Sequence, residues 1–332
     1  MKALLSETPG GPETLLLKEL PTPEPGEGQV RVKVRAVGVN FPDLLIIKDQ
    51  YQFKPERPFS PGAELAGVVD AVGPEVTGLS VGDRVMALPL WGGMRGEVCV
   101  RADLCHKLPD DVSFEQAAAL QMTYGTSLYG LEARGGLTAG ETLLVLGAAG
   151  GVGLAAVELG HALGARVIAA VSSEEKRRVA MEHGAEDGVV YPGGPLDRDD
   201  QKALSSAFRE KLGKSGADVI FDTVGGDYTE PALRSVAWLG RYLIVGFPAG
   251  IAKIPANLPL LKSCDIRGVF WGAAVERDNA GFHRDMDRLL GLLGEGRLNP
   301  RIHASYPLEK AGDAIAELST RGIIGKVIVT LG

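Results

Sequence analysis

The stretch Thr142-Leu-Leu-Val-Leu-Gly-Ala-Ala-Gly-Gly-Val-Gly153 decides how this chain folds. Residues 142–146 form a continuous apolar run, which is typical of a strand buried on both faces of a parallel sheet. A glycine-rich turn follows and leads into a helical stretch up to residue 163, and a second apolar strand is predicted at 166–171. Strand, glycine loop, helix and strand together form the unit from which doubly wound sheets are built.

The glycine loop also predicts a ligand. The backbone amides at Gly150, Gly151 and Val152 would open the helix and face a pyrophosphate, which the helix dipole also favours. Gly153 would let the helix approach the strand closely. Ala148 stands where the dinucleotide fingerprint has its first glycine, so the motif departs from the pattern at one position. The alternative is a structural glycine turn within an α/β sheet.

Apolar strands continue to alternate with helices beyond this unit. Strands are predicted at 188–191, 218–222, 241–245 and 265–270, and helices at 174–183, 201–211 and 228–237. This alternation predicts a doubly wound parallel sheet.

The first third of the chain has a different pattern. In Gln29–Val39 the valines at 30, 32 and 34 alternate with charged residues, as in a half-buried strand, and further strands are predicted at 64–72 and 84–88. Short strands separated by glycine and proline indicate a compact antiparallel barrel. The tail adds helices near 282–293 and 308–318 and a strand at 326–331, so the fold class is α/β with two domains.

Composition excludes several classes of protein. The 332 residues are 45% hydrophobic and 23% charged, which is ordinary for a globular protein. A net charge of −7 argues against nucleic acid and anionic membranes as partners. No run reaches the roughly 18 apolar residues of a membrane span, and no secretory signal is evident. Three cysteines suit a reducing compartment, so we expect a cytoplasmic protein.

The end of the second strand predicts which dinucleotide binds. An acidic residue about 20 positions after the first glycine would hold the ribose 2′-hydroxyl of NAD. The chain instead has Ser172 and Ser173 there, followed by Lys176 and Arg177, and these cations suit the 2′-phosphate of NADP. Alternatively, residues 174–177 form a solvated helical turn, in which Glu174 could accept a hydrogen bond from the ribose of NAD.

The motifs resemble those of the medium-chain dehydrogenase/reductase superfamily, specifically its zinc-free, zeta-crystallin-like quinone oxidoreductase branch. The resemblance covers essentially the whole chain and rests on five segments: Gly38-Val-Asn-Phe-Pro-Asp43, Pro61-Gly-Ala-Glu-Leu-Ala-Gly67, Gly82-Asp-Arg-Val85, Ala148-Ala-Gly-Gly-Val-Gly153 and Gly325-Lys326. It implies a discontinuous GroES-like β-barrel catalytic domain at 1–123 and 267–332, and a Rossmann NADP-binding domain at 124–266. It also implies a homodimer, for which the apolar strand at 266–270 offers a sheet edge.

The resemblance further implies that no metal is bound. Zinc-dependent members of the superfamily place a Cys where Asn40 stands and a His where Ala63 stands, and neither residue present can replace those ligands. Without a Lewis acid to polarise a carbonyl, the acceptor must already be electron-poor, such as a quinone or a C=C bond conjugated to a carbonyl.

Site residues follow from the same resemblance. Asn40, Asp43 and Tyr51 match polar positions around the nicotinamide and the substrate, and Tyr51 also matches a proposed proton donor of enoyl thioester reductases. Alternatively, Tyr51 packs a loop, and Phe270 and Trp271 are plain strand core. The predicted cofactor contacts are Thr126, Ala149, Gly150, Gly151, Val152, Gly153, Ser172, Lys176, Tyr191, Gly246, Phe247, Phe270, Trp271, Arg321 and Lys326.

These expectations describe an NADPH-dependent oxidoreductase that transfers hydride to a small-molecule acceptor, either a quinone or an α,β-unsaturated carbonyl. One alternative is an enoyl thioester reductase, because Lys48, Lys54 and Arg57 flank Tyr51 and could meet the phosphates of coenzyme A. An alternative of another class is a noncatalytic, crystallin-like NADPH-binding protein. The sequence leaves the physiological acceptor open.

Overall fold

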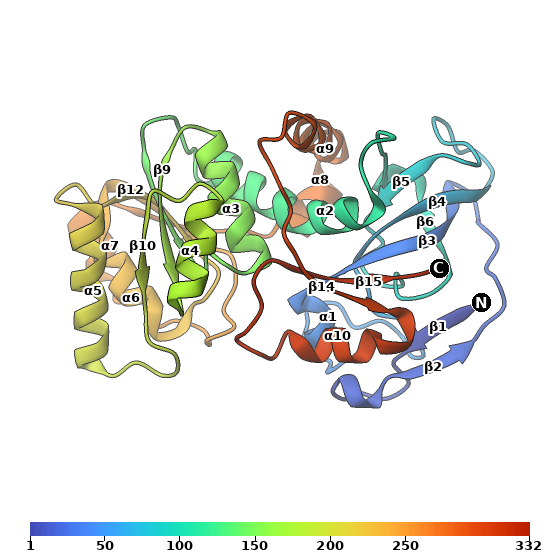
Figure 1. The fold of residues 1–332 in the computed structure, drawn as a ribbon, viewed down its shortest axis with the longest axis horizontal. Coiled ribbons are helices and arrows are strands. Elements are labelled where there is room, and N and C mark those ends of the chain that lie inside the picture. Colours follow the sequence, from blue (N-terminus) through green and yellow to red (C-terminus); the bar gives the residue numbers. More distant parts are fainter. The chain divides into compact units, whose positions relative to one another are not determined.

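A computed structural model describes residues 1–332 as two compact units (Figure 1). Unit 1 comprises Met1–Met122 and Pro300–Gly332, and unit 2 comprises Thr123–Asn299. The segment 267–299 therefore packs in unit 2, although the family resemblance assigns it to the barrel domain. Strand pairing accounts for the start of this segment, because residues 265–268 extend the parallel sheet of unit 2.

Unit 2 is built on six strands that pair in parallel throughout. Their order is β10-β9-β8-β11-β12-β13, which is the doubly wound arrangement that the sequence predicts. The apolar run at 142–146 is a central strand, and its last four residues are buried. The strands are β8 (Thr142–Leu146), β9 (Arg166–Val171), β10 (Asp187–Val190), β11 (Ala217–Asp222), β12 (Val236–Ile244) and β13 (Asp265–Gly268).

Helices connect these strands and cover the sheet. Contacts place α3 against β8 and β9, and α4 against β9 and β10 (Figure 1). Ile168, Ile220, Phe208 and Tyr242 belong to the buried core of this unit. The α-helices are α2 (Phe114–Leu128), which begins in unit 1, α3 (Gly151–Ala162), α4 (Glu174–Glu182), α5 (Arg198–Leu212), α6 (Thr229–Leu233), α7 (Asn257–Lys262), α8 (Trp271–Arg277) and α9 (Asn279–Gly294). A π-helical turn at Tyr129–Arg134 and a 3-10 turn at Gly226–Tyr228 complete the unit.

Unit 1 is built on a seven-stranded sheet with the order β14-β15-β3-β4-β5-β7, in which β6 also pairs with β3. All its pairs are antiparallel except β14 with β15. The strands are β3 (Gln29–Val39), β4 (Glu64–Val72), β5 (Arg84–Ala87), β6 (Glu97–Arg101), β7 (Cys105–Lys107), β14 (Ile302–Pro307) and β15 (Lys326–Thr330), and a separate pair is β1 (Lys2–Leu5) with β2 (Leu16–Glu19).

The alternation predicted for β3 is confirmed. Val30, Val32 and Val34 are buried, whereas Lys33 and Arg35 are exposed. Two short α-helices, α1 (Phe41–Ile46) and α10 (Ala311–Glu317), and 3-10 turns at Pro12–Thr14, Ala102–Leu104 and Leu308–Lys310 join the strands. Neither unit contains a helix with the length and apolarity needed to cross a bilayer.

Candidate functional site

The glycine loop of unit 2 joins β8 to α3 by a tight turn. Gly147 has a φ of +72°, and its carbonyl oxygen accepts a hydrogen bond from the Gly150 amide at 3.0 Å. A Cβ atom at Gly153 would lie 2.1 Å from the same oxygen, so only glycine allows α3 to pack this close to the end of β8. The helix begins at Gly151, and its first amides are those that an α-helix leaves without partners in the helix.

At the end of the neighbouring strand β9, Ser172 and Lys176 come together. The Lys176 ammonium donates to Ser172 Oγ at 3.2 Å. The Lys176 amide donates to Ser173 Oγ, which caps α4, so the first turn of this helix directs Lys176 back toward the strand end. A hydroxyl and an ammonium in contact form a donor pair that suits a phosphate.

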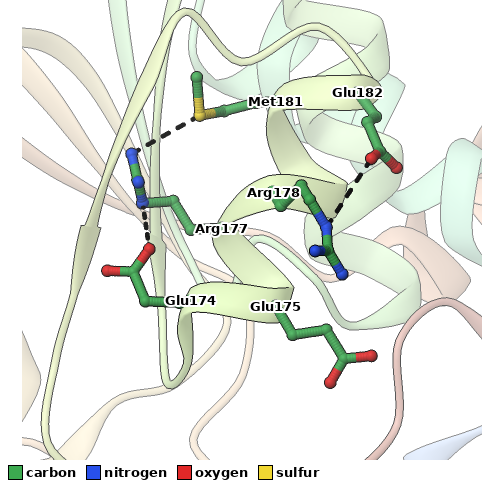
Figure 2. A pocket seen from close by; sticks show the side chains of 6 residues that line it. All are labelled: Glu174, Glu175, Arg177, Arg178, Met181 and Glu182. Atoms are coloured by element: carbon green, nitrogen blue, oxygen red, sulfur yellow. Dashed lines mark hydrogen bonds and ion pairs between the residues drawn. The ribbon is translucent and has the colours of Figure 1, made fainter.

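On the outward face of α4, charged side chains pair with one another. A recess of about 630 Å³ lies on this face. Figure 2 shows the side chains that line it, which are Glu174, Glu175, Arg177, Arg178, Met181 and Glu182. Arg177 pairs with Glu174 at 2.8 Å, and Arg178 pairs with Glu182 at 3.9 Å. Of the two cations predicted for the 2′-phosphate, Arg177 lines this recess and Lys176 does not. The predicted alternative of a solvated helical face therefore describes Glu174 and Arg177, whereas Lys176 lies apart from it.

The other predicted cofactor residues of unit 2 differ in their burial. Tyr191 and Trp271 are buried, and the Trp271 ring packs against Phe282 with centroids 6.2 Å apart. Phe247 and Phe270 are about half exposed, and Phe270 precedes α8 instead of lying in a strand, so the strand-core alternative does not describe it. Gly246 follows β12, Ala149 lies buried in the glycine loop, and Thr126 lies in α2.

In unit 1, Asn40 lies at the centre of a buried polar cluster with Glu64 and Lys326. The Asn40 side-chain amide donates to Glu64 Oε1 at 2.8 Å and to the Gly38 carbonyl at 3.1 Å. The Lys326 ammonium donates to Asn40 Oδ1 at 2.5 Å and to Glu64 Oε1. Glu64 Oε2 accepts from the Met122 amide. Because 286 residues separate Asn40 from Lys326, no local sequence pattern predicts this pairing.

Asp43 lies beside this cluster, in the first turn of α1. Its two oxygens accept hydrogen bonds from the backbone amides of Asn40, at 2.8 Å, and Gly62, at 2.9 Å. Complete burial raises the pKa of Asp43 to about 6, although both hydrogen bonds favour the carboxylate. The carboxyl therefore ties the start of α1 to the segment before β4.

Tyr51 lies half-buried in the loop after α1 and contacts Phe53 edge-to-face, with ring centroids 5.8 Å apart. Burial and the negative charge of Asp43 raise the pKa of the Tyr51 phenol above its usual value of 10. The phenol is therefore protonated at neutral pH and can act as a donor. Arg321 lies exposed in the segment before β15.

The structure contains no group of three or more His, Cys, Asp and Glu side chains that could hold a metal ion. Ala63 is buried, and the side chain of Asn40 is occupied by the hydrogen bonds described above. Absence of a metal remains a prediction about the protein in solution.

Comparisons with known proteins agree with this architecture. Residues 26–110 match the family of alcohol dehydrogenase GroES-like domains, and residues 151–289 match the family described as zinc-binding dehydrogenases. A curated relative, quinone oxidoreductase-like protein 2 of Bos taurus, is 39% identical over 96% of this chain and 89% of its own length.

Two solved structures are similar over their full length. Quinone oxidoreductase of Escherichia coli, complexed with NADPH, superposes with a TM-score of 0.91 at 27% identity, and each chain covers the other completely. A mycobacterial protein complexed with NADPH also gives 0.91, at 30% identity and with complete coverage of both chains. This chain therefore belongs to the medium-chain dehydrogenase/reductase superfamily, in its quinone oxidoreductase-like branch.

Proposed function

We propose that the protein is an NADPH-dependent reductase of electron-poor acceptors, namely quinones or α,β-unsaturated carbonyls. The observation that carries the choice of cofactor is the contact between Ser172 and Lys176 at the end of β9. Similar proteins were solved with NADPH, which agrees with this choice. When bound, NADPH would supply a hydride, and its pyrophosphate would meet the first amides of α3.

We assign the movement of a proton to Tyr51, in unit 1. Addition of hydride to the β-carbon of an enone leaves an enolate, which needs a hydrogen bond at oxygen and a proton at the α-carbon. The Tyr51 phenol keeps its proton at neutral pH, since burial raises its pKa, and it can supply either. For a quinone, aromatisation drives the reduction and water can protonate the oxygens, so the need for this donor is smaller.

Asp43 and Asn40 have different roles in this proposal. Both oxygens of Asp43 accept backbone amides, and both hydrogens of the Asn40 amide are donated within the unit. Neither side chain has a hydrogen to give to a developing oxyanion while Asp43 is ionised. We infer that these two residues shape the site and that Tyr51 carries the proton chemistry.

An enoyl thioester reductase is the second candidate, because of the cations beside Tyr51. One of them, Arg57, is bound within unit 1: it pairs with Asp49 at 2.8 Å, donates to the Ile47 carbonyl and stacks over Phe59. Lys48 and Lys54 are left to meet the phosphates of coenzyme A. Because Arg57 is already paired, fewer cations can bind coenzyme A, and we therefore favour a quinone or a simple enone over a thioester.

The proposal includes a cytoplasmic homodimer that binds neither nucleic acid nor membrane and carries no zinc. Elemental analysis of dialysed protein tests the last point, and about one zinc per chain together with loss of activity to a chelator would contradict it. The function itself is tested by NADPH oxidation with a panel of quinones, enones and enoyl thioesters. Turnover of any acceptor would also exclude the noncatalytic, crystallin-like alternative.

A further inference from the structure

Lys326 carries a buried charge with two defined partners. It is the first residue of β15 and is only 4% exposed, and its ammonium contacts Glu64, which is fully buried. A buried ammonium is tolerated when an anion and hydrogen bonds compensate for the lost water. Glu64 supplies the anion, and Asn40 Oδ1 supplies a further acceptor at 2.5 Å.

Strand order brings these three side chains together. In the sheet of unit 1, β3 lies between β15 and β4. Val39 pairs with Val327, and Gly38 pairs with Glu64, so the end of β3 is flanked by Lys326 on one side and Glu64 on the other. Asn40 follows at this end and receives contacts from both neighbouring strands.

These contacts select one orientation of the Asn40 amide. With Oδ1 toward Lys326, the NH₂ group donates to Glu64 Oε1 and to the Gly38 carbonyl. Rotation of the amide by 180° would turn the NH₂ group toward the ammonium and Oδ1 toward two oxygen acceptors. A donor would then face the ammonium donor, and an acceptor would face the two acceptors. Lys326 and Glu64 therefore hold the amide in one orientation.

Gly38 provides the space for this arrangement. A Cβ atom at Gly38 would lie 2.5 Å from Glu64 Oε1 and 2.2 Å from the Ala118 carbonyl oxygen. The Asn40 backbone amide also holds Asp43, in the first turn of α1. The fixed amide therefore belongs to the segment that leads into α1 and the Tyr51 loop.

We propose that Lys326 is a positioning residue that acts through Asn40, instead of contacting the cofactor. This inference rests on the proposed reductase function and refines the role of one of its site residues. The ammonium holds the Asn40 side-chain amide in one orientation, and rapid turnover needs this orientation.

A double-mutant cycle between Lys326→Met and Asn40→Ala tests whether Lys326 affects turnover through Asn40. Lys326→Met is expected to lower kcat by up to about 100-fold through misplaced site groups, with Kd for NADPH nearly unchanged. In the Asn40→Ala background, Lys326→Met should cause little further loss of kcat. A direct cofactor contact would instead raise Kd for NADPH equally in both backgrounds, and that result would overturn the proposal.

Two further comparisons control for folding. Lys2→Met changes an exposed lysine that also begins a strand, and it should leave kcat and Kd unchanged. Since Lys326→Met leaves Glu64 buried without its cation, the double variant Lys326→Met/Glu64→Gln is compared with Glu64→Gln alone. If the pair folds equally well and kcat still falls on loss of Lys326, the proposal holds; if kcat is equal in the two, it fails.

A spectroscopic measurement reads the Asn40 amide without any turnover. The chain has four asparagines (Asn40, Asn257, Asn279 and Asn299), so selective ¹⁵N-asparagine labelling gives few side-chain signals, and Asn40→Ala assigns the relevant one. We expect its NH₂ hydrogens to exchange slowly with water and to lose this protection in Lys326→Met. Unchanged protection would overturn the proposal, whereas absence of turnover with every acceptor would overturn only the proposed function.

Discussion

Lys176 Nζ donates to Ser172 Oγ across 3.2 Å at the end of β9, and the neighbouring Glu174 is engaged by Arg177. This arrangement places a cation and a hydroxyl where an NAD-binding protein would use a carboxylate.

Replacement of Lys176 by alanine should therefore weaken NADPH selectively. We expect a loss of about 1–3 kcal/mol in NADPH binding and almost none for NADH, because only NADPH carries the charged 2′-phosphate. Fluorescence titration of both cofactors measures this difference. Arg178→Ala is the matched control, since Arg178 belongs to the same helix but pairs with Glu182. An equal effect of Lys176→Ala on both cofactors would show that Lys176 does not contact the phosphate.

Tyr51→Phe should separate the two classes of acceptor. Loss of the phenol is expected to slow enone reduction by about 10²–10⁴-fold if Tyr51 transfers the proton in the rate-limiting step. Quinone reduction should fall much less, and NADPH affinity should stay nearly constant. Steady-state kinetics with one enone and one quinone measure the contrast, with Tyr129→Phe as a control outside the predicted site.

Two outcomes would revise the role of Tyr51. Equal loss for both acceptors through weaker NADPH binding would make Tyr51 a cofactor-pocket residue. No change for either acceptor would leave it as packing for the loop, where it contacts Phe53.

Asp43 should give the folded protein a characteristic dependence on pH. Burial raises the pKa of Asp43 from 3.8 to about 6, so the folded chain binds this proton more tightly than the unfolded chain does. The contribution of Asp43 to stability is therefore largest below about pH 4 and declines as the pH rises to about 6, by up to about 3 kcal/mol.

Asp43→Asn cannot titrate and should lose this component. Because one backbone amide would then face an NH₂ group, we also expect a lower stability at pH 5 than in the wild type. Urea unfolding between pH 4 and 7 measures both proteins. Parallel pH profiles would show that Asp43 has no raised pKa.

The edge of the sheet in unit 2 should form a dimer interface. Strand β13 is one of the two edge strands, and β12 and α7, which contact each other, expose Trp238, Leu239, Leu260 and Leu261. Large exposed apolar side chains beside an open sheet edge are typical of a surface that pairs with a second copy. Light scattering should give twice the chain mass of 34.9 kDa, and Trp238→Arg should shift the protein toward a monomer. A wild-type mass near 35 kDa at micromolar concentration would argue against a dimer.

Local patterns predicted much of this fold. The glycine loop and its flanking apolar runs predicted β8, α3 and β9, and alternating valines predicted the buried face of β3. These patterns succeed because strand and helix periodicity depends on neighbours in the sequence.

Features that depend on tertiary contacts could not be predicted from the sequence. The helix predicted at 228–237 ends at Leu233, because β12 begins at Val236 and contains Leu239 at a φ of +60°. The contact of Lys326 with Asn40 and Glu64 requires the strand order β15-β3-β4, which no local pattern encodes.

Turnover measured with purified protein tests the central claim most directly. NADPH oxidation is followed with one quinone, one enone and one enoyl thioester, and each assay is repeated with NADH. The account predicts that NADPH reduces the quinone or the enone with a higher kcat/KM than NADH does, and that the thioester is a poorer acceptor. Preference for NADH, or absence of turnover with all three acceptors, would contradict it.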